Sequence, residues 1–136
     1  MIEVAAGLVF DNGKLLITQR PQGTHLSGLW EFPGGKREAA ESFQACLVRE
    51  LLEELGIRVQ VGALFHRLTH HYPDKAVYLE FYLCSLLKNS PKPTAIGCAA
   101  FSWVEMHQLA HYQFPDADRQ LVSALTRSSD LWGIIA

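Results

Sequence analysis

The chain has 136 residues, close to the commonest size of a single domain, which predicts one domain over residues 1–136 with one hydrophobic core. Apolar residues make up 49% of the chain and charged residues 19%, a composition typical of globular proteins that argues against disorder. The net charge of −2 gives no support for polynucleotide binding, and the apolar opening is too short for a membrane span and lacks the basic start of a signal peptide.

The first two predicted strands form a hairpin. Residues 2–10 and 15–19 are apolar and rich in strand formers, and Asn12-Gly13 lies between them. Asn-Gly between two apolar runs favours a tight hairpin turn, because both residues tolerate positive φ. Residues 21–28 carry Pro, Gly, Thr and Ser without periodicity, so we expect a loop there. A short extended piece over residues 29–32 should end at the proline that follows it.

A helix is predicted after this loop region. Ser42 is a suitable N-terminal cap, and Gly56 is a suitable left-handed residue at the C-terminal end. The apolar positions predicted to face the core are Ala45, Leu47, Val48, Leu51, Leu52 and Leu55.

Three acidic residues on this helix share one face. Glu50, Glu53 and Glu54 follow an i, i+3, i+4 spacing, which places three carboxylates close together. Like charges at this spacing repel, and acidic residues in a last turn oppose the helix dipole, so helix stability does not explain them. A divalent cation would remove both objections, and hard oxygen ligands suit Mg²⁺ or Mn²⁺. The pattern therefore predicts a metal-dependent enzyme that acts on a phosphate anhydride.

The second half of the chain supplies further strands and helices. Residues 58–68 and 76–87 have strand patterns and are joined by a turn at Tyr72-Pro73-Asp74. After a loop over residues 88–96, we expect a strand over 99–104 and helices over 105–111 and 116–126. Strands on both sides of the central helix predict an α/β (α+β) domain with a mixed β-sheet sandwiched between helices. The apolar end LWGIIA would pack either on this core or on a second copy, so a monomer and a homodimer both remain open.

Cysteine usage points to a reducing compartment. The three cysteines, Cys46, Cys84 and Cys98, are odd in number and lie far apart, without the close spacing of zinc ligands. We therefore expect reduced, mostly buried thiols in a cytoplasmic protein.

The stretch around the acidic helix resembles the Nudix box, G-x5-E-x7-R-E-U-x-E-E-x-G-U, where U is aliphatic. Its fixed positions are matched by Gly35, Glu41, Arg49, Glu50, Leu51, Glu53, Glu54, Gly56 and Ile57. The pieces AAGLVF, ITQR, LWEFPGGK, YPDK and FPDAD extend the resemblance to the MutT-like branch of the family over residues 2–125. The resemblance implies a single-domain Nudix fold and the hydrolysis of a nucleoside triphosphate to the monophosphate and pyrophosphate, with water attacking an inner phosphorus.

The resemblance also implies the catalytic residues. Glu50, Glu53 and Glu54 would ligate Mg²⁺ or Mn²⁺ together with the carbonyl of Gly34, and one of these glutamates or a metal-activated water would generate the nucleophile. Arg49 would orient the neighbouring carboxylates through ion pairs. Structural roles in the box fall to Gly35, Glu41 and Gly56.

Substrate-binding positions follow from the same resemblance. They are Arg20, His25, Phe32, Val4, Asp74, Val77 and Asp118. Arg20 would hold phosphate and His25 would lie on a loop over the substrate. Phe32, Val4 and Val77 would form the base pocket, although the same residues would also serve as ordinary core. Asp74 and its neighbour Lys75 would shape the rim of the pocket.

Asp118 bears on the choice of base. Family members specific for 8-oxoguanine carry an asparagine there that both accepts and donates, whereas an ionised aspartate only accepts. The carboxylate favours a base edge that presents donors, and burial that raised its pKa would let it donate. We expect sanitation of oxidised nucleotides such as 8-oxo-dGTP. The alternatives are a CTP, 5-methyl-dCTP or broad dNTP pyrophosphohydrolase and, from another class, a non-catalytic nucleotide-sensing domain.

The expected metal shell has one departure from the family. A loop glutamate that usually adds a ligand is replaced by Gly97, and the sequence between Leu83 and Val104 holds no Asp or Glu. Either the box glutamates and water suffice, or Glu80 or another carboxylate substitutes. We expect metal dependence to be retained. The expected partner is a small-molecule nucleoside triphosphate, with no polynucleotide and no membrane.

Overall fold

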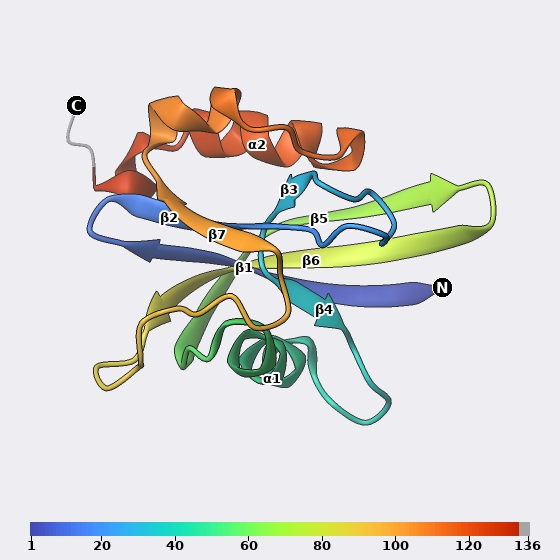
Figure 1. Ribbon diagram of the computed structural model, residues 1–136, viewed down its shortest axis with the longest axis horizontal. Helices are drawn as coiled ribbons and strands as arrows, with labels where there is room; N and C mark the ends of the chain where they lie inside the picture. Colours follow the sequence, from blue (N-terminus) through green and yellow to red (C-terminus); the bar gives the residue numbers. More distant parts are fainter. Residues whose placement is uncertain (134–136) are drawn as a thin grey trace.

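A mixed β-sheet with helices on both of its faces organises the computed structural model, which describes residues 1–133 (Figure 1). The strands are β1 (Ile2–Asp11), β2 (Lys14–Gln19), β3 (Trp30–Glu31), β4 (Gly34–Lys36), β5 (Val59–Tyr72), β6 (Lys75–Leu86) and β7 (Ala100–Val104). Helix α1 (Phe43–Leu55) covers one face, and α2 (Arg119–Thr126) covers the other with short 3₁₀ turns at Met106–His111, Asp116–Asp118 and Ser129–Trp132. This arrangement confirms the predicted mixed α+β fold.

Strand β1 lies at the centre of the sheet. It runs parallel to β6 and antiparallel to β4 and β2, so that Ala5 lies opposite both Gly35 and Glu80. Strand β2 also pairs with β3 and β7, and β5 forms the outer strand beside β6. The short strand β4, which carries the Gly-Gly pair, is held against β1, and the short strand β3 lies at the edge of the sheet beside β2.

Both predicted hairpin turns are present. Asn12 and Gly13 have φ values of 51° and 74°, as a tight turn between β1 and β2 requires. Strand β5 is longer than predicted, because its ladder with β6 continues through His70 and His71 to the pair of Tyr72 and Lys75. The last residues of β5 are mostly polar, so this part of the strand lacks the hydrophobic pattern from which strands are predicted (Figure 1).

Helix α1 begins and ends as predicted, but its core face is narrower. The Ser42 side chain accepts a hydrogen bond from the Ala45 N–H at 3.0 Å, and Gly56 ends the helix with a φ of 69°. The prediction that Ala45, Val48 and Leu52 face the core is wrong, since all three are exposed. The buried residues are Cys46, Leu47, Leu51 and Leu55.

The packing of α1 on β1 explains that narrower face. An added Cβ at Gly7 would lie 3.2 Å from Leu51 Cδ1 and 3.4 Å from Leu47 Cδ1, so the glycine allows close approach along one line of residues. Val48 and Leu52 lie about 100° further round the helix and miss the sheet.

The C-terminal part is less regular than predicted. In place of one helix over residues 116–126, a 3₁₀ turn precedes α2, with Asp118 at the junction. Trp132 is buried, contacts Phe10 edge-on and donates through Nε1 to the Leu125 carbonyl at 3.0 Å. The start of the LWGIIA segment therefore packs on the core, while residues 134–136 lie outside the described residues. Within residues 1–133, no helix has both the length and the apolar character to cross a membrane.

Candidate active site

The Gly-Gly pair on β4 brings the backbone of that strand unusually close to its neighbours. A Cβ on Gly34 would lie 2.0 Å from the Ala5 carbonyl oxygen, and a Cβ on Gly35 would lie 2.2 Å from Glu50 Cδ. Real Cβ contacts are not this short, so a side chain at Gly34 would collide with the β1 backbone, whereas a side chain at Gly35 would have to displace the Glu50 carboxyl. The carboxyl group of Glu50 on α1 consequently packs directly against the β4 backbone.

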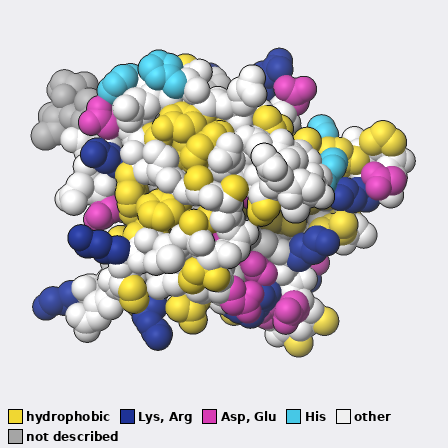
Figure 2. Space-filling view, in the orientation of Figure 1, with side chains coloured by type: hydrophobic (Ala, Val, Ile, Leu, Met, Phe, Trp, Pro, Cys, Tyr) yellow, Lys and Arg dark blue, Asp and Glu magenta, His cyan; other side chains and the backbone are white. Residues whose placement is uncertain are grey.

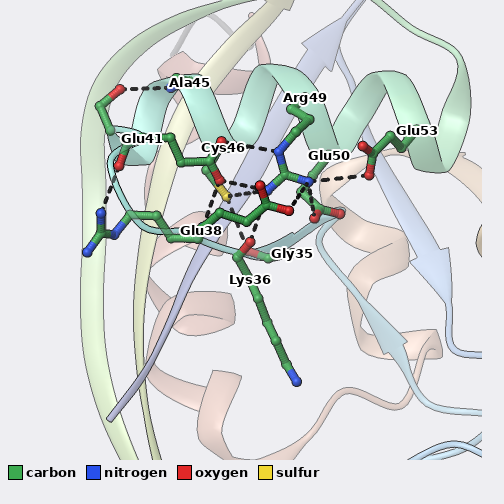
Figure 3. A network of polar contacts seen from close by, with 11 residues as sticks. Gly35, Lys36, Glu38, Glu41, Ala45, Cys46, Arg49, Glu50 and Glu53 are labelled. Carbon is green, nitrogen blue, oxygen red and sulfur yellow. Dashed lines mark hydrogen bonds and ion pairs between the residues drawn. The ribbon is translucent and has the colours of Figure 1, made fainter.

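Arg49 connects the acidic side chains around this contact (Figure 3). Its guanidinium donates to Glu41 at 2.6 Å, to Glu50 at 2.9 Å and to Glu53 at 3.3 Å. It also donates to the Lys36 carbonyl at 3.1 Å. The hydrogen bond from Arg49 lowers the pKa of Glu41 to about 2, so that carboxylate stays ionised at neutral pH. Arg49 therefore orients carboxylates from the loop and from α1 with one planar group.

Glu54 is not paired with a cation in this way. Burial raises its pKa to about 8, and the charge of Glu31 on β3 adds to the shift. Burial also raises the pKa of Glu50, against the lowering effect of Arg49. Figure 2 shows acidic and basic side chains gathered together near α1 and the loop before it. A cation placed beside Glu50 and Glu54 would favour their ionised forms.

The donor set has the chemistry that a hard divalent cation requires. Carboxylate and carbonyl oxygens, from Glu50, Glu53, Glu54 and Gly34, are the ligands that Mg²⁺ and Mn²⁺ prefer. In the described part of the chain, no three Asp, Glu, His or Cys side chains converge into a ready-made cation site. Glu50 and Glu53 instead contact Arg49, and the Glu53 side chain is 60% exposed.

A cleft opens beside the Gly-Gly pair. It consists of two adjoining hollows of about 180 Å³ and 310 Å³ that share Val4, Arg20, Glu31, Lys36 and Asp118 among their lining residues. We call their union the central cleft. Of the positions predicted to bind substrate or metal, the central cleft is lined by Val4, Arg20, His25, Phe32, Gly34, Val77 and Asp118. Asp74 is exposed and is not among the lining residues, whereas its neighbour Lys75 is.

Asp118 is a buried residue that lines both hollows of the central cleft. The residue is only 6% exposed, and its side chain makes no cap hydrogen bond at the start of α2. Burial raises its pKa to about 7, and the charge of Glu31 contributes. Near neutral pH both protonation states are therefore accessible, and this carboxyl can either accept or donate a hydrogen bond.

Glu31 and Tyr72 are among the residues of the central cleft that the sequence analysis did not assign to the site. Glu31 pairs with Arg20 at 3.2 Å, and Arg20 in turn donates through Nε to the His25 carbonyl at 2.5 Å. Burial raises the pKa of Glu31 despite this pairing. A lone acid within the apolar stretch LWEFP was the available signal. The second residue is Tyr72, which was interpreted only as part of a turn and which lines the central cleft.

The loop that carries Gly97 does reach the acidic helix. The Gly97 N–H donates to the Glu54 carbonyl at 3.0 Å, and a Cβ at Gly97 would lie 3.4 Å from Glu54 Cα. Glu80 faces hydroxyl groups instead, since it accepts hydrogen bonds from Tyr78 at 2.7 Å and from Tyr82 at 2.5 Å. Of the two explanations offered for the missing loop ligand, substitution by Glu80 finds no support in these contacts.

Comparison with known proteins gives consistent matches. A family model described as NUDIX domain matches residues 5–124. An 8-oxo-dGTP diphosphatase of Haemophilus influenzae is 38% identical over 126 residues, which cover 92% of this chain and 91% of the relative. A CTP pyrophosphohydrolase of Escherichia coli is 55% identical over 62 residues, 46% of each chain. The solution structure of the E. coli ORF135 protein superposes with a TM-score of 0.79 at 33% identity, covering 94% of this chain and 90% of the other.

Proposed function

We infer, because this chain belongs to the Nudix hydrolase family, that it cleaves a nucleoside triphosphate to the monophosphate and pyrophosphate. The observation that carries this proposal is the packing of the Glu50 carboxyl against Gly35, because Gly34 and Gly35 also line the central cleft and so place the acidic face of α1 next to it. Hydrolysis of an anhydride requires neutralised phosphates, a positioned water and a fixed substrate. The helix glutamates would hold a cation that neutralises the phosphates and positions the water, and the residues of the central cleft would fix the substrate.

The proposed metal is Mg²⁺ or Mn²⁺, held by Glu50, Glu53, Glu54 and the Gly34 carbonyl. When bound, such an ion neutralises phosphate charge and activates water. The chain's own part is to hold the carboxylates. Arg49 does so through its hydrogen bonds to Glu50 and Glu53. Arg20 lines the central cleft, and its charge is balanced by Glu31. From this position the Arg20 guanidinium would bind a phosphate group of the substrate.

The proposed substrate class is an oxidised nucleotide such as 8-oxo-dGTP, and the proposed role is sanitation of the nucleotide pool. The relatives matched over most of the chain support this choice by their names. A CTP, 5-methyl-dCTP or broad dNTP pyrophosphohydrolase is the second candidate. It is favoured by the carboxylate of Asp118, which in its ionised form prefers an amino group on the base. Free thiols at Cys46, Cys84 and Cys98 support a reducing, cytoplasmic location.

Base preference is tested by measuring kcat/KM for 8-oxo-dGTP, dGTP, CTP, 5-methyl-dCTP and 2-hydroxy-dATP in Mg²⁺. We expect the highest value for 8-oxo-dGTP, with release of pyrophosphate. A higher value for a cytosine nucleotide would select the second candidate. No turnover of any of the five would reject the hydrolase proposal.

A further inference from the structure

Tyr72 lines the larger hollow of the central cleft, where its ring packs against three neighbouring side chains. Its ring centroid lies 4.9 Å from that of His25 and 4.4 Å from that of His70, both in edge-to-face geometry. The Lys75 ammonium lies 5.7 Å from the centre of the same ring. His25 belongs to the loop after β2 and Tyr72 ends β5, so this aromatic contact joins two segments across the central cleft. Tyr72 is therefore positioned by three neighbours rather than free in solvent.

The polar groups of Tyr72 and Asp118 are both unused. Among residues 1–133, the Tyr72 hydroxyl and the Asp118 carboxyl take part in no side-chain hydrogen bond, although Asp118 is 94% removed from solvent. Tyr72 is half-buried, and the Asp118 oxygens are not among the fully buried polar atoms of the described residues, so both groups are accessible to a ligand in the central cleft. The ionised carboxylate only accepts hydrogen bonds, whereas the hydroxyl can donate.

The Tyr72 phenol and the Asp118 carboxyl also interact electrostatically. Burial raises the pKa of the Tyr72 phenol, and the Asp118 charge raises it further. The hydroxyl consequently stays protonated at neutral pH and remains a donor. An edge of cytosine, adenine or 8-oxoguanine presents a donor beside an acceptor, which the ionised Asp118 carboxylate cannot match alone.

We propose that Tyr72 is a specificity-determining residue whose hydroxyl donates a hydrogen bond to the nucleobase while Asp118 accepts one from the same base edge. This inference rests on the proposed function, since it assigns the base-binding end of the same site. It assigns the donor role to the end of β5 and the acceptor role to the junction before α2.

The test is a double-mutant cycle of Tyr72→Phe and Asp118→Asn. Tyr72→Phe keeps the ring and its contacts and removes only the hydroxyl. It should raise KM for the preferred nucleotide about 3- to 10-fold with kcat nearly unchanged, the effect of one lost hydrogen bond. In the Asp118→Asn background the same change should cost less than about 2-fold, because the amide itself donates. The matched control is Tyr78→Phe on the same hairpin, whose hydroxyl bonds to Glu80 and which should behave as wild type.

Binding measurements separate this inference from the reaction. Calorimetry with 8-oxo-dGMP and dCMP should show the same Tyr72-dependent loss, whereas affinity for tripolyphosphate, which has no base, should stay unchanged. If wild type binds these monophosphates in a Tyr72-dependent way but hydrolyses no triphosphate, the reaction is rejected and the role of Tyr72 stands. That role is overturned if Tyr72→Phe matches wild type, if its cost is equal in both backgrounds, if tripolyphosphate binding falls equally, or if wild type binds no monophosphate.

Discussion

At the scale of single residues, Gly35 and the Glu50 carboxyl pack directly against each other. We predict that Gly35→Ala displaces the Glu50 carboxylate, because a Cβ would lie 2.2 Å from Glu50 Cδ. A misplacement of about 1 Å can cost about 100-fold in rate, so kcat/KM should fall by roughly that factor. Gly97→Ala is the matched control, since its Cβ would meet Glu54 only at 3.4 Å. Equal activities of the two variants would contradict the assigned contact.

Asp118 gives a pH-dependent prediction. Its pKa is about 7 in the folded protein against 3.8 for the free side chain, so the folded state binds more protons between these values. Its contribution to the free energy of unfolding is therefore full below pH 4 and is lost as pH rises through about 7. Asp118→Asn should remove this dependence. The change in the free energy of unfolding that the substitution causes should be more stabilising at pH 8 than at pH 4, by about 2 to 4 kcal/mol. Denaturant unfolding at both pH values measures the difference, and an unchanged pH profile would refute the burial argument.

The sequence predicted the residues with a strict spacing and missed those that depend on long-range contacts. The box glutamates and Arg49 share one helix, so their proximity follows from helix periodicity alone. Glu31 and Tyr72 line the central cleft only because β3 and β5 lie beside other strands, which no local pattern specifies. The roles assigned to Arg20, His25 and Phe32 stay predictions, although all three line the central cleft.

At the scale of elements, the N-terminal cap of α1 lies apart from the acidic residues of the same helix. Ser42 accepts the Ala45 N–H at the first turn, whereas the acidic residues lie in the last two turns. Ser42→Ala should lower the free energy of unfolding by about 1 kcal/mol and leave kcat unchanged below the melting transition. Thermal unfolding and a rate measurement on the same sample test both parts. A large loss of kcat would show that the helix start is coupled to the site.

Element boundaries were predicted well where caps and turns are encoded locally. Ser42, Gly56 and Asn12-Gly13 each mark an end that the structure retains. The core stripe of α1 was predicted too wide, because the crossing of helix and sheet at Gly7 decides which apolar residues are buried. Exposed Val48 and Leu52 are thus a consequence of tertiary packing, not of helix periodicity.

At the scale of the whole molecule, metal binding should stabilise the fold. An ion that binds only the folded state adds about 2.7 kcal/mol at 100 times its dissociation constant. We predict that Mg²⁺ or Mn²⁺ raises the melting temperature in a saturable way, that EDTA reverses the rise, and that Glu54→Gln reduces it. Differential scanning calorimetry at several metal concentrations measures this. Equal shifts for wild type and Glu54→Gln would place the ion elsewhere.

The mixed character of the sheet was predicted from the sequence, but the pairing of its strands was not. The alternation of strands with a central helix predicted a mixed sheet between helices, as observed. The parallel pairing of β1 with β6, far apart in the chain, has no local signature. It is this pairing that brings Val4 and Val77 to one wall of the central cleft.

The central claim, metal-dependent hydrolysis by the helix glutamates, is tested most directly by product analysis of wild type and Glu53→Gln with 8-oxo-dGTP in Mg²⁺. We predict that wild type releases monophosphate and pyrophosphate in equal amounts. Glu53→Gln should lower the rate by about 100-fold or more, because loss of a residue that only supports a metal ligand typically costs about 10- to 100-fold. Intact hydrolysis by Glu53→Gln, or release of orthophosphate in place of pyrophosphate, would contradict the account.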